Sequence, residues 1–131
     1  MYENRDANCI FCNSELFSIK ARNSLALSFD DKYPVAKGHS LIVPTRHVDS
    51  FFDLGSAEQK ACFKLLEEIK QQIVKKDVSV SGFNIGINDG IDAGQTILHC
   101  HIHLIPRRKG DIADPRGGVR HVIPSKGFYL S

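Results

Sequence analysis

The sequence contains no run of about 18 apolar residues, so it offers no candidate for a membrane-spanning helix. Charge of one sign is also scarce: the formal net charge is +2, too small to indicate nucleic acid or a membrane surface as the main partner. Residues 1–6 are polar and lack an apolar signal core. The four cysteines are few for a disulfide scaffold. We therefore expect a cytoplasmic protein that binds neither nucleic acid nor membrane.

Length and composition favour one globular domain. The chain has 131 residues, of which 42% are hydrophobic and 24% charged, and it contains no internal repeat or low-complexity segment. We expect a single domain over 1–131, with a core at about 7–109. The tail at about 110–131 is rich in glycine, proline and basic residues, so we expect it to wrap the surface without adding core.

The regular elements are legible from the spacing of apolar residues. Between 61 and 73 they recur at intervals of three and four, which predicts a helix with Ser56 as N-cap, Gln59 completing a capping box, and an end near 76–77. Short apolar or alternating segments predict strands at 16–21, 24–29, 40–43, 83–87 and 98–105. This order predicts an α+β fold with a mostly antiparallel sheet of about five strands.

Three histidines alternate along the last predicted strand: His99, His101 and His103. Side chains alternate between the faces of a strand, so these three should share one face, roughly 6.5–7 Å apart in succession. Three interpretations compete at this point. The residues could form an exposed polar face, a catalytic metal site that uses all three imidazoles, or a phosphate site with one nucleophile and one anion donor.

A polar, glycine-punctuated segment at 88–96 precedes this strand. Gly94 permits close approach of the backbone to a ligand, and Gln95 and Thr96 carry amide and hydroxyl donors suited to phosphate oxygens. The same segment also has the composition of an ordinary hairpin turn, since Asn-Asp-Gly is common turn chemistry. The two roles are compatible.

Cys9 and Cys12 form a Cys-x-x-Cys pair near the amino terminus. This spacing suits tetrahedral zinc, but two thiolates make only half of such a site. Two buried thiols are the simpler alternative, and a redox role would favour a thioredoxin-like βαβ context that the pattern lacks.

The motifs together resemble the histidine triad (HIT) superfamily of nucleotide hydrolases and transferases, in its zinc-containing bacterial type. The resemblance covers about residues 7–109. It rests on the segment from His99 to His103 with the apolar pair after it, on 94–96, on 31–34, and on the segment from Gly38 to His47. It implies a HIT-like fold with one long helix and a short one.

The resemblance also implies a mechanism. His101 would attack the α-phosphorus of a dinucleoside polyphosphate or a nucleoside phosphoramidate, forming a nucleotidyl-histidine intermediate that water or another acceptor then opens. His103, with Gln95 and Thr96, would donate hydrogen bonds to the non-bridging oxygens. His39 would join the catalytic set from the shell around the triad. The alternative function is a nucleotide-binding regulatory protein with little turnover.

The remaining sites follow from the same resemblance. The nucleotide, expected to carry adenine, would be held at its ribose by Asp31, with Asp30 one residue away as the alternative. Substrate-binding roles also fall on Asn88, Phe11 and Phe29, although aromatic residues are more often plain core. Lys32 stands where relatives carry an apolar residue against the base, which is a departure from the family pattern. Arg116 or Arg120 could reach distal phosphates, and His121 has no assigned role.

A structural zinc ion and a homodimer complete the expectations drawn from the resemblance. In zinc-bearing relatives, four positions corresponding to Cys9, Cys12, His47 and His99 hold one ion. Such a Cys₂His₂ set leaves no open coordination position for water, so the metal would hold the fold together rather than catalyse. His101 and His103 would then be free for phosphate.

Overall fold

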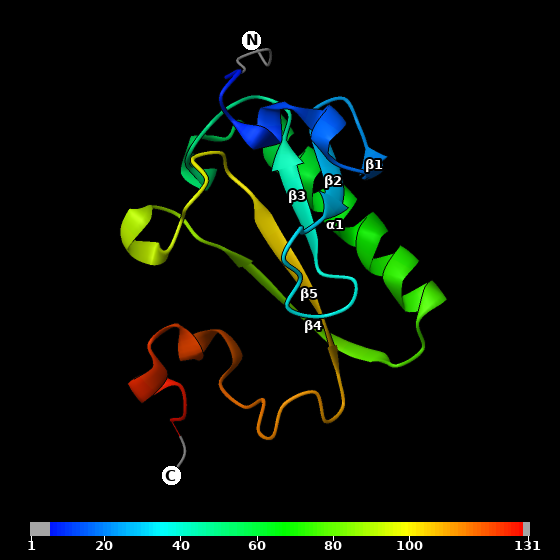
Figure 1. Cartoon of the computed structure of the whole chain (residues 1–131), viewed down its shortest axis with the longest axis vertical. Coiled ribbons are helices and arrows are strands. Elements are labelled where there is room, and N and C mark those ends of the chain that lie inside the picture. Colours follow the sequence, from blue (N-terminus) through cyan, green and yellow to red (C-terminus); the bar gives the residue numbers. More distant parts are fainter. Residues whose placement is uncertain (1–5, 130–131) are drawn as a thin grey trace.

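The computed structural model describes residues 6–129 and shows a five-stranded antiparallel sheet with one long α-helix on one face (Figure 1). The strands are β1 (Ile19–Arg22), β2 (Ala26–Asp30), β3 (Ser40–Pro44), β4 (Val80–Ile87) and β5 (Ile102–Arg108). Their order in the sheet is β1-β2-β3-β5-β4, and every neighbouring pair is antiparallel. The α+β class and the five-stranded sheet expected from the sequence are confirmed.

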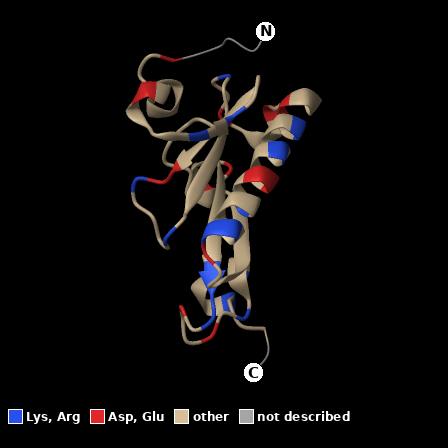
Figure 2. Cartoon of the chain, turned by 90° about the vertical axis from the view of Figure 1, so that its right-hand side faces the viewer, with Lys and Arg blue, Asp and Glu red and all other residues tan. Residues whose placement is uncertain are grey.

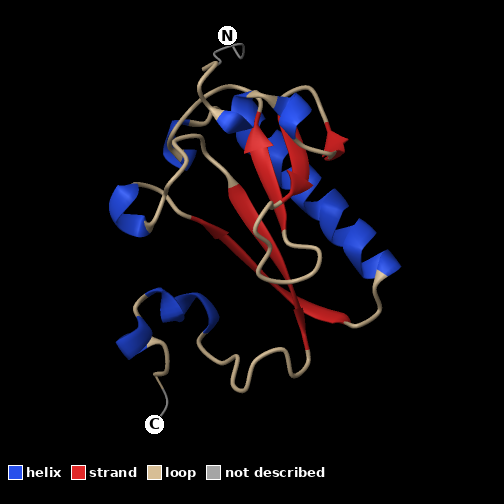
Figure 3. Ribbon diagram, in the orientation of Figure 1, coloured by secondary structure: helices blue, strands red, loops and turns tan. Residues whose placement is uncertain are grey.

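Helix α1 (Ser56–Lys76) connects β3 to β4 and packs on one face of the sheet (Figure 3). The stripe it buries contains Cys62, Leu65, Ile69 and Ile73, as the three-and-four spacing predicts, and also Glu58, which that spacing does not predict. Against it lie inward-facing residues of the strands, including Ile42, Ile102 and Leu104. The described helical segments other than α1 are 3₁₀ helices of three to five residues.

The start of α1 differs from the prediction by one residue. Gly55, not Ser56, is the N-cap, and Glu58 replaces Gln59 as the capping partner, because the Gly55 N–H donates to Glu58 Oε1 at 2.9 Å. The buried Glu58 carboxylate also accepts from Arg46 Nε at 3.0 Å and from its terminal nitrogen at 2.8 Å. This ion pair holds the N-terminus of α1 against the loop after β3. The spacing of apolar residues in the sequence could not predict it.

The segment after β5 folds back beneath the sheet, on the side away from α1 (Figure 1). It contains two 3₁₀ helices, Gly118–Val122 and Pro124–Lys126, and leaves most of its apolar side chains exposed. Figure 2 shows basic and acidic residues interleaved along α1 and in the tail. Among the described residues, no helix is long and apolar enough to cross a membrane.

Candidate nucleotide-phosphate site and metal centre

His101 is held by the backbone immediately before β5. Its Nδ1 lies 2.8 Å from the carbonyl oxygen of His99, and a carbonyl can only accept, so Nδ1 carries the hydrogen. The other nitrogen, Nε2, therefore keeps its lone pair when the ring is neutral. The ring is 7% exposed and makes edge contacts with Phe11 at 5.1 Å and His103 at 5.2 Å between centroids. The hydrogen bond to the carbonyl of His99 therefore fixes the direction of the lone pair on His101 Nε2.

The histidine segment is not a strand along its whole length. Regular pairing begins at Ile102, opposite Ile42 on one side and Ile87 on the other, so the strand predicted to start at 98 starts four residues later. Cys100 N–H instead donates to the carbonyl of Val48 at 2.7 Å, in the loop after β3. Because this irregular stretch turns the chain, His99 is fully buried toward the cysteines while His103 faces the open side of the sheet.

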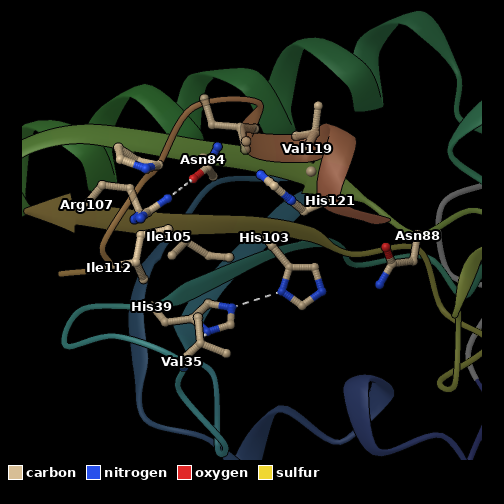
Figure 4. Close-up of a pocket in the computed structure, with 14 residues that line it drawn as sticks. Val35, His39, Asn84, Asn88, His103, Ile105, Arg107, Ile112, Val119 and His121 are labelled. Carbon is tan, nitrogen blue, oxygen red and sulfur yellow. Dashed lines mark hydrogen bonds between the residues drawn. The ribbon is translucent and has the colours of Figure 1, made fainter. Parts of the chain in front are cut away.

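A chain of hydrogen bonds orients His103. The amide of Val35 donates to His39 Nδ1 at 3.1 Å, so neutral His39 carries its hydrogen on Nε2. That nitrogen lies 2.9 Å from His103 Nδ1, which then accepts (Figure 4). The tautomer that satisfies this chain places the His103 hydrogen on Nε2, where it is available to a substrate oxygen. His39 is therefore a positioning residue for His103.

Burial keeps these imidazoles neutral. Desolvation lowers the pKa of His103 to about 4; positive charge on His101 or His39 would lower it further, and the Asp31 carboxylate opposes the shift. Desolvation also lowers the pKa of His39 against the opposing effect of Asp31. Near pH 7, His103 is thus a neutral hydrogen-bond donor rather than an imidazolium.

The low pKa of His103 has a consequence for stability. Unfolded histidine titrates near 6.5, so between pH 6.5 and 4 the unfolded chain binds a proton that the native state does not. Stability therefore falls as pH falls through this window. The side chain of His103 is 22% exposed, so solvent screening reduces the effect. We expect this residue to lower the free energy of unfolding by about 2 kcal/mol across the window.

Urea unfolding at pH 7 and 4.5 tests this expectation. The loss between the two pH values should be smaller in His103→Gln than in the wild type, since other groups titrate equally in both. Equal losses in the two proteins would contradict a buried neutral His103.

Asp31, rather than Asp30, lies beside the histidines. One oxygen of Asp31 is 3.4 Å from His39 Nε2 and 3.9 Å from His103 Nδ1, and the other accepts from the amide of Tyr33 at 2.8 Å. Asp30 points away and pairs with Lys20 at 3.1 Å. The sequence did not decide between these two acids, and the structure places Asp31, not Asp30, beside His39 and His103.

Cys9, Cys12, His47 and His99 converge at the opposite end of the histidine segment. Their ligand atoms, two Sγ and two Nδ1, lie within 4.8 Å of one another. The sulfur–nitrogen distances are 3.5 Å for Cys9 and His99, 3.4 Å for Cys12 and His47, and 3.6 Å for Cys12 and His99. Bond lengths typical of tetrahedral zinc place such atoms about 3.6 Å apart. The four residues therefore fit a zinc ion.

The atoms around this cluster also suit a metal. His99 Nε2 donates to the carbonyl of Pro44 at 2.8 Å, and His47 Nε2 faces Asp49 at 3.7 Å, so each ring directs Nδ1 toward the sulfurs. Burial lowers the pKa of His99 to about 4, which keeps it neutral as a ligand must be. The amide of Asp6 lies 3.3 Å from Cys12 Sγ. A metal ion held here would take His99 from the triad and leave His101 and His103 outside the metal site.

Two expected phosphate donors are placed differently from the expectation. Gln95 is 5% exposed, and its amide nitrogen donates to the carbonyls of Asp49 at 2.9 Å and Ile97 at 3.2 Å. In this conformation it organises the loop. Thr96 is exposed and lines a cavity of about 410 Å³ beside the cysteines, not the cavity beside His103. Their donor roles remain predictions.

The aromatic residues expected at the base are mostly core. Phe29 is fully buried and Phe11 is 5% exposed, with ring centroids 5.5 Å apart. Phe17, which sequence reasoning missed, stacks on Phe29 at 4.1 Å and carries the Lys32 ammonium over its ring at 5.0 Å. A base could contact only the edge of this cluster. Nothing in the alternation of 16–21 distinguished Phe17 from its neighbours.

A cavity of about 440 Å³ opens beside His39 and His103, and Asn88 lies at its rim (Figure 4). The tail contributes to its wall, including His121, the residue without an assigned role. Arg116 and Arg120 do not reach it: Arg116 pairs with Asp114 at 2.9 Å, and Arg120 lies over the Tyr129 ring. The basic side chain in the cavity is Arg107 instead.

Comparison with known proteins gives consistent results. The model of the HIT domain family matches residues 18–110. A bis(5'-nucleosyl)-tetraphosphatase (asymmetrical) from Schizosaccharomyces pombe is 41% identical over 93 residues, which are 71% of this chain and 50% of that protein. The chain thus spans half the length of this relative.

Two solved structures share the fold. A HIT family protein from Bacillus anthracis superposes with a TM-score of 0.73 at 31% identity, covering 95% of this chain and 81% of that one. A zinc-bound histidine triad family protein from Mycobacterium smegmatis gives a TM-score of 0.74 at 28% identity, covering 82% of this chain and 80% of that one.

Proposed function

The chain belongs to the HIT domain family, and on that premise we propose that it hydrolyses or transfers nucleotides by attack of His101 on an α-phosphate. Its substrates would be dinucleoside polyphosphates or nucleoside phosphoramidates, with adenine as the base. The observation that carries this proposal is the hydrogen bond from His101 Nδ1 to its own chain, which puts the hydrogen on Nδ1 and the lone pair on Nε2, next to the neutral donor His103. The tetraphosphatase relative from S. pombe supports the choice of substrate class.

In the first step, His101 Nε2 forms a bond to the α-phosphorus. The bond from phosphorus to the bridging oxygen breaks, and its electron pair leaves with the departing phosphate chain; in a phosphoramidate the nitrogen takes up a proton from solvent as its bond to phosphorus breaks, and it departs as the neutral amine. The Nδ1–H bond to the carbonyl of His99 stabilises the positive charge that develops on the ring. His103 Nε2–H donates to a non-bridging oxygen as charge moves there.

In the second step, water attacks the phosphorus of the nucleotidyl-histidine. The phosphorus–nitrogen bond breaks, its electron pair returns to Nε2, and the proton of the water passes to solvent. Asp31 would hold the ribose and Asn88 the phosphate side, while His39 keeps the His103 ring in its donor tautomer. An acceptor other than water would make the same protein a transferase.

Cys9, Cys12, His47 and His99 would hold a structural zinc ion, whose chemistry here is to tie the amino-terminal segment to the histidine segment. The zinc-bound M. smegmatis structure supports this assignment. All four positions of a tetrahedral ion are then filled by protein, so no metal-bound water takes part. A single domain over 1–131, the homodimer and the cytoplasmic location stay predictions; β4 is the last strand of the described sheet on one side, and its edge would be a surface for a second copy.

Trapping of a covalent intermediate tests the proposal. Brief incubation with diadenosine tetraphosphate or adenosine phosphoramidate, followed by denaturation and peptide mapping, should place one adenylyl group on His101. Label on another residue would contradict the assigned nucleophile. Tight nucleotide binding without label or turnover would support the alternative, a regulatory nucleotide-binding protein.

A further inference from the structure

A second cavity lies on the other face of the sheet, the face that α1 covers. It has a volume of about 440 Å³ and is formed by the C-terminal end of α1, the loop from β2 to β3 (31–39) and the end of β5. Ser40 pairs with Leu104, whose side chain packs in the core under α1, whereas His103 faces the opposite side. Among the described lining residues, this helix-side cavity shares only His39 with the cavity beside His103.

Part of the helix-side cavity is apolar. Ile73 of α1, which is 7% exposed, lines it together with Pro34 and Gly38 of the loop. Gly38 has φ +92°, and a Cβ at this position would lie 3.1 Å from the Pro106 ring and 3.9 Å from Ile73. Glycine therefore lets the loop lie close against α1 and β5, and the contact fixes one wall of the cavity. The volume lies within the range of pockets that bind small organic molecules.

Two ion pairs hold the rim of the helix-side cavity in place. Lys20 Nζ lies 3.1 Å from Asp30 Oδ1. Arg108 donates to the Asp77 carboxylate at 2.9 Å and to the carbonyl oxygen of Lys37, also at 2.9 Å. The charges within each pair offset one another, so these four side chains mainly fix the loop and the end of α1 against β5.

Two further lysines in the lining are left without a partner. Lys37 of the loop and Lys76 of α1 are exposed, and within residues 6–129 neither ammonium group has an ion-pair or hydrogen-bond partner. The remaining acid of the lining, Asp31, faces His39 at 3.4 Å and accepts from the amide of Tyr33. The cavity therefore offers two uncompensated positive charges, which suit a doubly charged group such as a phosphate monoester.

The surroundings of these lysines disfavour a bare anion. The last carbonyls of α1 carry partial negative charge, and Asp77 is the C-cap of the helix. Ammonium groups that are exposed to water contribute little to the affinity for a single ion. Contact with Ile73 and Pro34 must therefore supply much of the binding free energy. The ligand chemistry that fits is a phosphate group attached to a compact apolar or aromatic body.

The loop that walls this cavity also serves the catalytic face. The amide of Val35 donates to His39 Nδ1, and His39 Nε2 lies 2.9 Å from His103 (Figure 4). On the cavity side, the carbonyl of Gly38 accepts from the Ser40 hydroxyl at 2.8 Å. A ligand that binds only when residues 31–39 adopt this conformation favours the same conformation on the catalytic face.

We propose that the helix-side cavity binds a small organic phosphate monoester and that its occupancy strengthens nucleotide binding on the opposite face of the sheet. Lys37 and Lys76 contact the phosphate, and Ile73 and Pro34 contact the apolar body. The bound ligand holds residues 31–39 in the conformation that orients His39. The effect on nucleotide binding rests on the proposed function, whereas binding in the cavity does not.

An NMR titration with phenyl phosphate locates the site. In the ¹⁵N-labelled protein, the probe should shift the backbone amides of residues 37–38 and 73–77, which lie around the cavity. Because the apolar body contributes to binding, phenyl phosphate should bind about tenfold more tightly than inorganic phosphate. Shifts confined to the surroundings of His101 and His103, or equal affinities for the two probes, would overturn the proposal.

Two double variants test the role of the unpaired lysines. Lys37→Met with Lys76→Met removes both charges from the cavity and should weaken the binding of phenyl phosphate about tenfold. Lys70→Met with Lys75→Met removes the same charges from exposed positions of α1 that do not line the cavity, so the affinity should stay within twofold of the wild type. Equal affinities in the two double variants would overturn the proposal.

Equilibrium binding to the His101→Ala protein tests the coupling without turnover. Saturating phenyl phosphate should raise the affinity for diadenosine tetraphosphate about fivefold, and Lys37→Met with Lys76→Met should abolish the increase. An unchanged affinity, or a lower one that reveals competition on the catalytic face, would overturn the coupling. If diadenosine tetraphosphate does not bind at all, the proposed function fails, yet the NMR shifts and their dependence on the two lysines still support the helix-side cavity as a ligand site.

Discussion

Replacing His101 with alanine is expected to lower kcat/KM by about 10⁴-fold or more for diadenosine tetraphosphate and for adenosine phosphoramidate alike. The expected loss is similar for both because the same nucleophile displaces the leaving group of each substrate in the first step. Substrate affinity should change little, since the ring is only 7% exposed and most of its contacts are with Phe11, His103 and the carbonyl of His99. Steady-state kinetics and equilibrium binding on the same variant measure the two effects separately.

The variant needs a control for misfolding, because His101 is packed among buried rings. His101→Gly assayed with added imidazole provides one: free imidazole can occupy the vacated space and restore part of the turnover only if the rest of the site is intact. Cys100→Ala, at the neighbouring position on the core side, should keep near-normal kinetics. Turnover within tenfold of the wild type in His101→Ala would refute a covalent mechanism at this residue.

The contrast between His101 and His121 shows what the sequence can predict. His101 and His103 could be identified from the sequence, because their alternation lies within one short segment and the motif around them resembles a known family. The position of His121 depends instead on the chain reversal between Gly117 and Gly127, where close backbone approach matters more than any periodic pattern. Local pattern therefore indicated the candidate reacting groups, whereas the part of the cavity wall that the tail supplies could be found only in the tertiary structure.

The same distinction explains the smaller discrepancies. The sequence identified Cys9 and Cys12 as half of a metal site, and only the resemblance supplied His47 and His99, which lie far away in the chain. The strand start at Ile102 and the buried pairing of Glu58 with Arg46 were missed because both depend on the loop after β3. Long-range contacts to an irregular segment leave no spacing in the sequence to detect.

Removing the metal should affect stability far more than chemistry. A ligand that binds only the native state at 1,000 times its dissociation constant contributes about 4 kcal/mol, and loss of that amount should lower Tm by more than 10 °C in a domain of this size. The four ligands join the segment before β1 to the loop after β3 and to His99. A strong chelator, or Cys12→Ala, should therefore release this corner of the fold, as thermal unfolding with metal analysis can measure.

Turnover at low temperature distinguishes a structural ion from a catalytic one. His101 and His103 are not among the four clustered residues, so chelated protein that is still folded at 10 °C should keep most of its activity and lose it on mild warming. Cys62→Ala is the matched control, because this thiol lies on the buried face of α1 and outside the cluster; its metal content and response to chelator should equal those of the wild type. Immediate loss of activity in folded protein, restored by added zinc, would mean that the ion acts on the phosphate and that the division of the triad is wrong.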